Sequence, residues 1–184
     1  MPQPILVTFV GGSVCRWRVD STKTIVGEPL PAASRLAVYE QSPPASSPVP
    51  VWSLRGATSN ARYTTRAELT ELSARQEGLG RPETTCAALI PIRKNAAWWD
   101  LAQDERRAIF EEASQHISIG MDYLPGVARR LHHSRELGEP FDFLTWFEFA
   151  PAHAPAFAEM LGRLRATAEW QYVDREAELM LRLD

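Results

Sequence analysis

The sequence of 184 residues has few cysteines and no long apolar run. Its two cysteines, Cys15 and Cys86, are too few for a disulfide framework and lack the spacing of metal ligands. No apolar run reaches the roughly 18 residues of a transmembrane helix. The apolar run Ile5–Val10 is interrupted by Gly11 and Gly12, which is not the pattern of a signal peptide. We therefore expect a cytoplasmic protein with no membrane partner.

An excess of charge of one sign is also lacking. The formal net charge is −3, with 23% charged residues, so electrostatics gives no reason to expect nucleic acid or an anionic membrane as a partner. The hydrophobic content of 45% is ordinary for a soluble globular protein. The length suits one compact unit, or two small subdomains that share a core.

The pattern of apolar residues predicts an α+β fold. In the second half we expect strands at Cys86–Arg93, Gly126–Arg135, Asp142–Phe149 and Tyr172–Leu183, and helices at Asp100–Ile119 and from Pro155 to about Arg165. Strand, helix, strand, strand, helix, strand is the ferredoxin-like order, with an antiparallel sheet and helices packed on one face. Because the first half shows part of the same theme, we predict two ferredoxin-like halves, a truncated one at 1–84 and another at 85–184.

The first half contains the weaker signals. Strands are predicted at Ile5–Val10, Arg35–Glu40 and near Val51–Ser59. The segment Gln41–Pro50 contains four prolines and three serines, which is typical of a loop. A capping-box pattern from Thr65 to Glu68 predicts the start of a helix that ends near Glu77.

One histidine lies on an apolar stripe of the predicted helix Asp100–Ile119. Ile109, Ala113 and Ile117 follow the helical period, and His116 lies on the same stripe. A lone histidine on an apolar face is more often a hydrogen-bonded core residue than a metal ligand, so the pattern alone leaves both interpretations open.

An arginine interrupts the apolar face of the predicted strand Gly126–Arg135. By the period of two, Arg129 shares that face with Val127 and Leu131. Arginine keeps its charge, so burying it requires an anion nearby, although a side chain that reaches water or pairs with a glutamate is the simpler alternative. The facing strand has an aromatic side that is either plain core or a cavity wall, made of Phe143, Thr145, Phe147 and Phe149.

Three more polar residues are expected to face inward. Lys94 continues the apolar face of its strand, and Glu169 lies in the turn before the last strand. A carboxylate near a ligating histidine orients the ring, whereas an ordinary Lys–Glu pair on the rim contributes little. Gln76 lies on the stripe of Leu69 and Leu72 in its own helix.

Together these segments resemble the chlorite dismutase family, in particular its short, dimeric branch. The resemblance covers nearly the whole chain and is strongest from Ala87 to Leu183. It is carried by Ala87–Lys94, Trp98–Trp99, Asp104–Phe110, Gln115–Ile117, Tyr123–Pro125, Ala128–Arg129, Gly138–Glu148, Leu164–Thr167 and Glu169–Trp170.

The resemblance implies a role for each of the unusual residues. His116 is similar to the proximal ligand of haem b and its iron, Glu169 to the hydrogen-bond partner of that histidine, and Lys94 to the linked lysine. Arg129 is similar to the catalytic distal arginine, which binds chlorite or another small anion. The remaining haem-binding residues implied by the resemblance are the distal glutamine Gln76, the tryptophan pair Trp98 and Trp99, and the apolar wall at Phe147.

By the same resemblance the protein is a homodimeric enzyme that converts chlorite to chloride and dioxygen through ferryl and hypochlorite intermediates. Coprohaem decarboxylase, a haem-biosynthesis enzyme on the same fold, is one alternative, but its members generally lack the arginine found here at Arg129. A non-catalytic haem carrier or sensor would need His116 but not Arg129. In a haem-free interaction module, both residues would be structural.

Overall fold

The computed structural model describes residues 4–41, 43–44, 49–58 and 63–184. Its strands form a closed barrel in the order β1-β3-β2-β8-β5-β7-β6-β4, and all neighbouring strands are antiparallel. The strands are β1 (Leu6–Gly12), β2 (Trp17–Val26), β3 (Arg35–Glu40), β4 (Trp52–Thr58), β5 (Cys86–Lys94), β6 (Val127–His133), β7 (Phe143–Phe149) and β8 (Val173–Leu183). The mixed helix and strand fold with an antiparallel sheet is therefore confirmed.

The two halves of the chain meet along two seams of unequal length. One seam joins β2 to β8 over most of both strands, from Trp17 opposite Leu183 to Val26 opposite Glu176. The other joins β4 to β6 through only the pairs Ala57–His133 and Thr58–His132. The sequence did not predict β2, because most of its side chains are exposed and no buried face imposes an apolar alternation. Without that strand, closure of the sheet into one barrel could not be predicted either.

Alternate side chains of β5 and β7 enter two different cores. In β5, Ala87 and Leu89 point into the barrel, where they join a core that includes Phe9 and Trp146. Ala88 and Ile90 point outward, into a second core under the helices. The second core is the one next to the candidate site.

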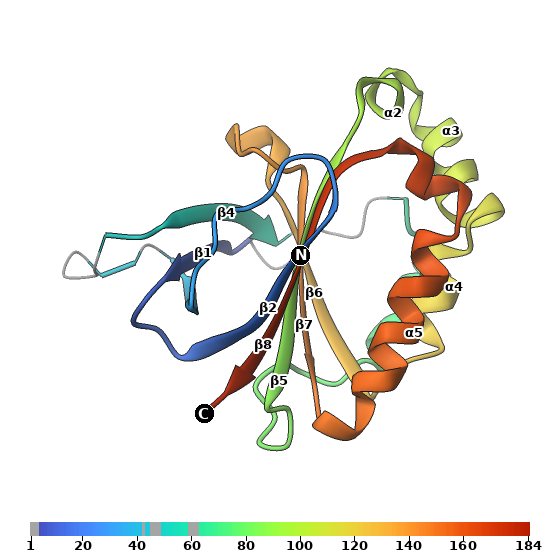
Figure 1. Cartoon of the computed structure of the whole chain (residues 1–184). Coiled ribbons are helices and arrows are strands. Elements are labelled where there is room, and N and C mark those ends of the chain that lie inside the picture. Colours follow the sequence, from blue (N-terminus) through green and yellow to red (C-terminus); the bar gives the residue numbers. More distant parts are fainter. Residues whose placement is uncertain (1–3, 42, 45–48, 59–62) are drawn as a thin grey trace.

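The helices gather on one side of the sheet, over β5, β6, β7 and β8 (Figure 1). Among the described residues, no helix is long and apolar enough to cross a membrane. The helices are α1 (Arg66–Arg75), α2 (Ala96–Asp100), α3 (Gln103–Arg107), the π-helical segment η1 (Ala108–Ala113), α4 (His116–Met121) and α5 (Ala154–Arg165), with short 3₁₀ turns η2 (Arg135–Leu137), η3 (Pro151–His153) and η4 (Ala168–Tyr172).

The prediction of one continuous helix over Asp100–Ile119 is wrong. The segment divides into the end of α2, then α3, η1 and α4, and Gln115 interrupts it with a left-handed backbone at φ 53°. The Glu111 carboxylate accepts hydrogen bonds from the backbone N–H groups of Ile117 and Ser118 at the start of α4. The Ser114 hydroxyl accepts a hydrogen bond from the backbone N–H of Glu169 in η4. As a result, His116 begins a new helix and does not lie on a continuous stripe.

The other predicted elements are confirmed to within two residues at each end, apart from Ser59 and part of the predicted loop Gln41–Pro50, which lie outside the described residues. The helix after Thr65 begins with the predicted capping box.

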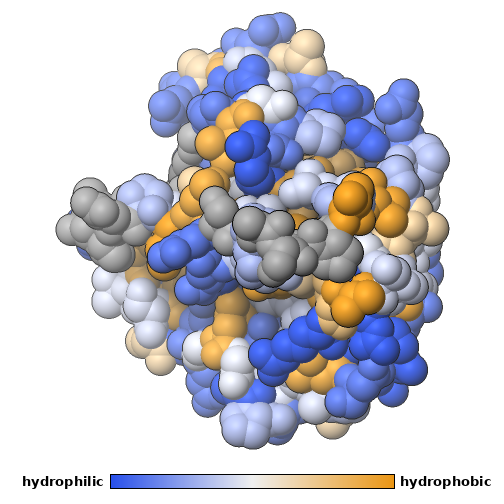
Figure 2. Space-filling model, turned by 90° about the vertical axis from the view of Figure 1, so that its left-hand side faces the viewer, coloured by the Kyte–Doolittle hydropathy of each residue, from blue (hydrophilic) through white to orange (hydrophobic). Residues whose placement is uncertain are grey.

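Where β1 and β4 face the viewer, apolar patches lie scattered among hydrophilic ones (Figure 2). The first half thus contributes strands to the barrel, while the second half supplies most of the helices.

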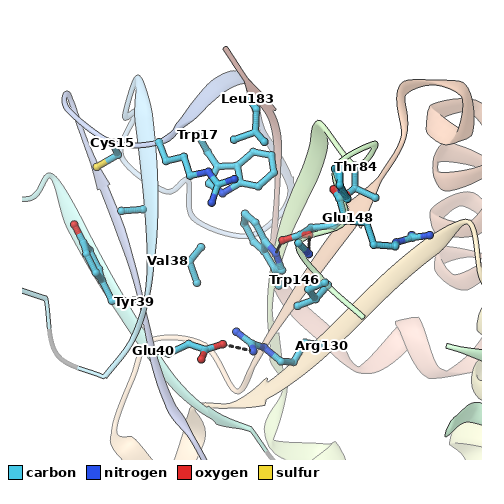
Figure 3. Close-up of a pocket in the computed structure, with 16 residues that line it drawn as sticks. Cys15, Trp17, Val38, Tyr39, Glu40, Thr84, Arg130, Trp146, Glu148 and Leu183 are labelled. Atoms are coloured by element: carbon cyan, nitrogen blue, oxygen red, sulfur yellow. Dashed lines mark hydrogen bonds and ion pairs between the residues drawn. The ribbon is translucent and has the colours of Figure 1, made fainter. Parts of the chain in front are cut away.

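The barrel interior is not completely filled. A cavity of about 570 Å³ is lined by inward-pointing side chains, among them Trp17, Val38 and Trp146 (Figure 3). Two of its charged lining residues are partnered: Arg130 pairs with Glu40, and Glu148 accepts hydrogen bonds from the Trp146 indole and the backbone of Gly80. This cavity lies on the inner face of the sheet, away from the residues that the sequence singled out.

Candidate functional site

The residues singled out by the sequence converge on the outer face of β5, β6 and β7, beneath the helices. Two adjoining cavities of about 340 and 80 Å³ lie there. The larger volume falls in the range that holds a cofactor-sized ligand. Both cavities are lined by Ile92, Phe110, His116, Leu131, Thr145 and Trp170. Most of these side chains are apolar, so the few polar groups among them decide what binds.

A buried chain of polar groups supports His116. The Glu169 carboxylate lies 2.7 Å from Nδ1 of His116 and 2.7 Å from Nζ of Lys94. Lys94 and Glu169 have side-chain exposures of only 3% and 5%. Because the carboxylate accepts, Nδ1 of His116 must donate, and in the neutral ring this leaves Nε2 as a lone-pair donor.

The charges of Lys94, His116 and Glu169 depend on one another. Burial alone would raise the pKa of Glu169, but the charges of His116 and Lys94 outweigh burial and lower that pKa to about 2. Burial lowers the pKa of Lys94, and Glu169 opposes the shift. Glu169 is therefore ionised at neutral pH, as its hydrogen bond to His116 requires.

His116 has one free coordinating nitrogen at the cavity. Its ring stacks on Phe110 at a centroid distance of 4.3 Å and lies parallel to Trp170 at 6.5 Å. No hydrogen bond to Nε2 joins it to any described residue, and the side chain is 24% exposed. Within the described part of the chain, no group of three His, Cys, Asp or Glu side chains could hold a metal ion.

Arg129 reaches the larger cavity from β6. Within the described residues no carboxylate lies at ion-pair distance from its guanidinium, which packs against the backbone of Gly120 in α4. Burial lowers the pKa of Arg129, and the charge of Glu111 partly opposes the shift. Gln76, at the end of α1, donates from Nε2 to the backbone carbonyl of Arg129 at 2.9 Å. The fold thus brings Arg129, Gln76 and His116 to one cavity.

The two tryptophans differ in position. Trp98 is buried, lines the smaller cavity and has the ammonium of Lys94 4.7 Å from its ring centroid. Its indole Nε1–H is buried and has no hydrogen-bond partner among the described residues. Trp99 points elsewhere: its Nε1 donates to Asp142, and the guanidinium of Arg135 lies over its ring at 3.7 Å. Trp98 is therefore the member of the pair that borders the cavity.

Phe147 lines the larger cavity and packs edge-on against Phe157 of α5 at 5.1 Å. The aromatic side of β7 predicted from the alternation thus forms a cavity wall. The sequence analysis did not single out Phe110 or Tyr63, which contribute further aromatic lining. The role of Glu111 was not predicted either. Its carboxylate accepts hydrogen bonds from two backbone N–H groups only because the helix is interrupted at Gln115.

Comparison with known proteins identifies the family. The family model described as chlorite dismutase matches residues 34–181. The chain belongs to the chlorite dismutase family. A dimeric chlorite dismutase from Nitrobacter winogradskyi has a similar structure, with 54% identity, a TM-score of 0.88 and coverage of 96% of this chain and 99% of that one.

More distant members of the chlorite dismutase family are longer. A chlorite dismutase from Candidatus Nitrospira defluvii, in complex with imidazole, is 28% identical with a TM-score of 0.59, over 72% of this chain and 55% of that one. A chlorite dismutase from Ideonella dechloratans is 39% identical over 62 residues, which is 34% of this chain and 20% of that protein. The chain thus matches only about half or less of these longer relatives.

Proposed function

We propose that the protein binds one haem b and decomposes chlorite to chloride and dioxygen. The observation that carries this proposal is the pairing of two groups at one apolar cavity: His116, held by Glu169, and Arg129, a cation without a carboxylate partner among the described residues. A metal ligand and a free cation at the same cavity suit an anion that reacts at a metal. The family assignment and the near-complete match to a dimeric chlorite dismutase support the same reaction.

The residues present fit haem. The porphyrin of haem supplies four ligands to the iron, so only one or two need come from the protein, and His116 offers one coordinating nitrogen. His116 would hold the iron through Nε2, and its Nδ1 hydrogen bond to Glu169 is the usual support of such a ligand. The unpartnered indole N–H of Trp98 is suited to donate to a carboxylate of the porphyrin. Phe110, Phe147 and Leu131 supply apolar contacts.

In the proposed mechanism, the protein orients the anion and excludes water. When bound, haem would supply the redox chemistry of the reaction. Arg129 would bind chlorite by charge-assisted hydrogen bonds and retain hypochlorite in the cavity. Glu169 holds the Nδ1 proton of His116, and Lys94 balances the charge of that carboxylate. Phe147 limits access of water.

Arg129 also favours this activity over the alternatives. A haem carrier or sensor requires His116 but has no use for a half-buried guanidinium that lacks a carboxylate partner among the described residues, because removing a charge from water costs free energy. The arginine likewise argues against a coprohaem decarboxylase. Gln76 supports the position of Arg129, because its amide donates to the backbone carbonyl of that residue.

We further propose that the two halves are related ferredoxin-like units and that the protein is a homodimer. In the second half the strand order is β8-β5-β7-β6, and the first half has the corresponding order β4-β1-β3-β2, with no helix between its strands among the residues that the structure describes. The homodimer is supported by the similarity to the dimeric Nitrobacter protein. Sedimentation equilibrium of the haem-loaded protein tests the assembly, and a monomer at micromolar concentration contradicts it.

The activity is tested with an oxygen electrode. We expect haem-loaded protein to release one dioxygen per chlorite without added reductant, since both oxygen atoms of chlorite leave together and chloride remains. Arg129→Ala should keep its haem but lose most sustained turnover, and His116→Ala should lose most haem. Arg163→Ala, which removes an exposed arginine on α5, is the matched control and should behave like the parent. No dioxygen from a fully loaded parent protein refutes the proposed function.

A further inference from the structure

Gly120 lies in α4, four residues after His116 and therefore on the same face of that helix. A Cβ atom built on Gly120 would lie 1.9 Å from Nη1 of Arg129 and 2.8 Å from its Cζ. The guanidinium of Arg129 thus rests on bare backbone, closer than any side chain at position 120 permits. Gly162, in α5, has no such neighbour: nothing lies within 4 Å of a Cβ atom built there.

The contact makes α4 the element that determines where the arginine rests. Glycine is less favourable than alanine within a helix, so its presence at position 120 costs stability unless packing requires it. Arg129 has no carboxylate partner among the described residues that could hold its guanidinium in place. The contact with the bare backbone of Gly120 therefore contributes to restricting the side chain.

The start of α4 is itself held firmly. The Glu111 carboxylate accepts the N–H groups of Ile117 at 2.6 Å and Ser118 at 3.3 Å. His116, at the first position of the helix, is held by Glu169. One short helix therefore presents both the histidine and the surface on which the arginine lies.

We propose that Gly120 is a positioning residue for the anion site, acting through Arg129. Its bare backbone accommodates the guanidinium beside the helix that carries His116, so that the cation lies where an anion in the cavity can be bound. The functional meaning of this placement rests on the proposed function, whereas the packing itself does not. A methyl group at position 120 displaces the guanidinium without changing its charge.

The packing is tested without haem, by thermal unfolding of four haem-free proteins: parent, Gly120→Ala, Arg129→Ala and the double variant. With the arginine absent, Gly120→Ala should raise Tm by about 2–4 °C, the usual gain from removing a helical glycine in a chain of this size. With the arginine present, this rise should be missing. The matched control, Gly162→Ala, should raise Tm equally in both backgrounds. An equal effect of Gly120→Ala with and without Arg129 overturns the proposal.

The consequence for the site is tested by fluoride binding to the haem-loaded variants, followed by absorbance. Gly120→Ala should raise the Kd for fluoride about tenfold when Arg129 is present, as expected for the loss of one charge-assisted hydrogen bond. It should change that Kd less than twofold, roughly, in the Arg129→Ala background, since coupled residues are not additive. An equal change in both backgrounds overturns the positioning role. If the parent binds no haem, the proposed function fails, while the unfolding experiment still tests the packing.

Discussion

Replacing Glu169 by glutamine should destabilise the haem-free protein strongly. The substitution preserves size but removes the negative charge that lies 2.7 Å from the Lys94 ammonium. Lys94 is then a buried cation without its ion-pair partner, although the rings of Trp98 and Trp170, with centroids 4.7 and 5.5 Å away, and the charges of Asp142 and Glu176 still act on it. Breaking a buried pair in this way costs about 3–5 kcal/mol, because the remaining charge stays uncompensated away from water. The low exposure of both side chains, 3% and 5%, places this pair in that class.

The assay is urea unfolding at pH 7, with the free energy of unfolding obtained by linear extrapolation. The double variant Lys94→Met with Glu169→Gln should recover most of the loss, since neither replacement carries a charge and no buried cation is left without its partner. Asp122→Asn breaks an exposed pair with Arg163, in which the side chains are 55% and 42% exposed, and should cost less than about 1 kcal/mol.

Two results would refute this reasoning. A loss for Glu169→Gln no larger than that for Asp122→Asn would mean that Lys94 reaches water or another anion once its partner is gone. A double variant as unstable as Glu169→Gln alone would mean that the loss comes from the hydrogen bond to His116 and not from the charge of Lys94. In either case the buried pair would not be the feature that makes Glu169 important for stability.

Two further predictions concern other elements. Burial lowers the pKa of His132 to about 4. Between pH 6.5 and 4 the unfolded chain thus binds a proton that the folded chain does not, so the free energy of unfolding should fall by about 2 kcal/mol from pH 7 to pH 5. His132→Asn should lose this pH dependence, and an unchanged profile would contradict the prediction. Glu111→Ala removes the acceptor for two N–H groups of α4 and should lower the free energy of urea unfolding by about 1–2 kcal/mol. The control Glu112→Ala, at an exposed neighbour, should lower it much less. Equal losses would rule out a role of Glu111 in stabilising the start of α4.

Local sequence patterns were sufficient where burial on one face imposes a regular repeat. The alternation in β6 and β7 correctly placed Arg129 and Phe147 toward one cavity, because a strand cannot turn one side chain without turning its neighbours. The capping box at Thr65 likewise marked the start of α1, since its two hydrogen bonds join residues three positions apart. The resemblance to the chlorite dismutase family then supplied roles that no local pattern could give.

Other features depended on contacts between distant residues. The helical pattern of Asp100–Ile119 did not show the break at Gln115, because the Glu111 carboxylate replaces helix hydrogen bonds of Ile117 and Ser118 only in the folded chain. The strand β2 could not be predicted for a similar reason. Its backbone pairing with β8 stabilises it, while most of its side chains are exposed and show no apolar alternation.

The sequence by itself determined which residues are available for chemistry and which face of each strand they occupy. Only the tertiary structure decided that Lys94, His116 and Glu169 meet, because these residues lie on three separate elements. It also decided that the guanidinium of Arg129 rests against Gly120. Side-chain periodicity is a property of neighbours along the chain, whereas hydrogen bonds between separate elements exist only once packing has fixed their distance.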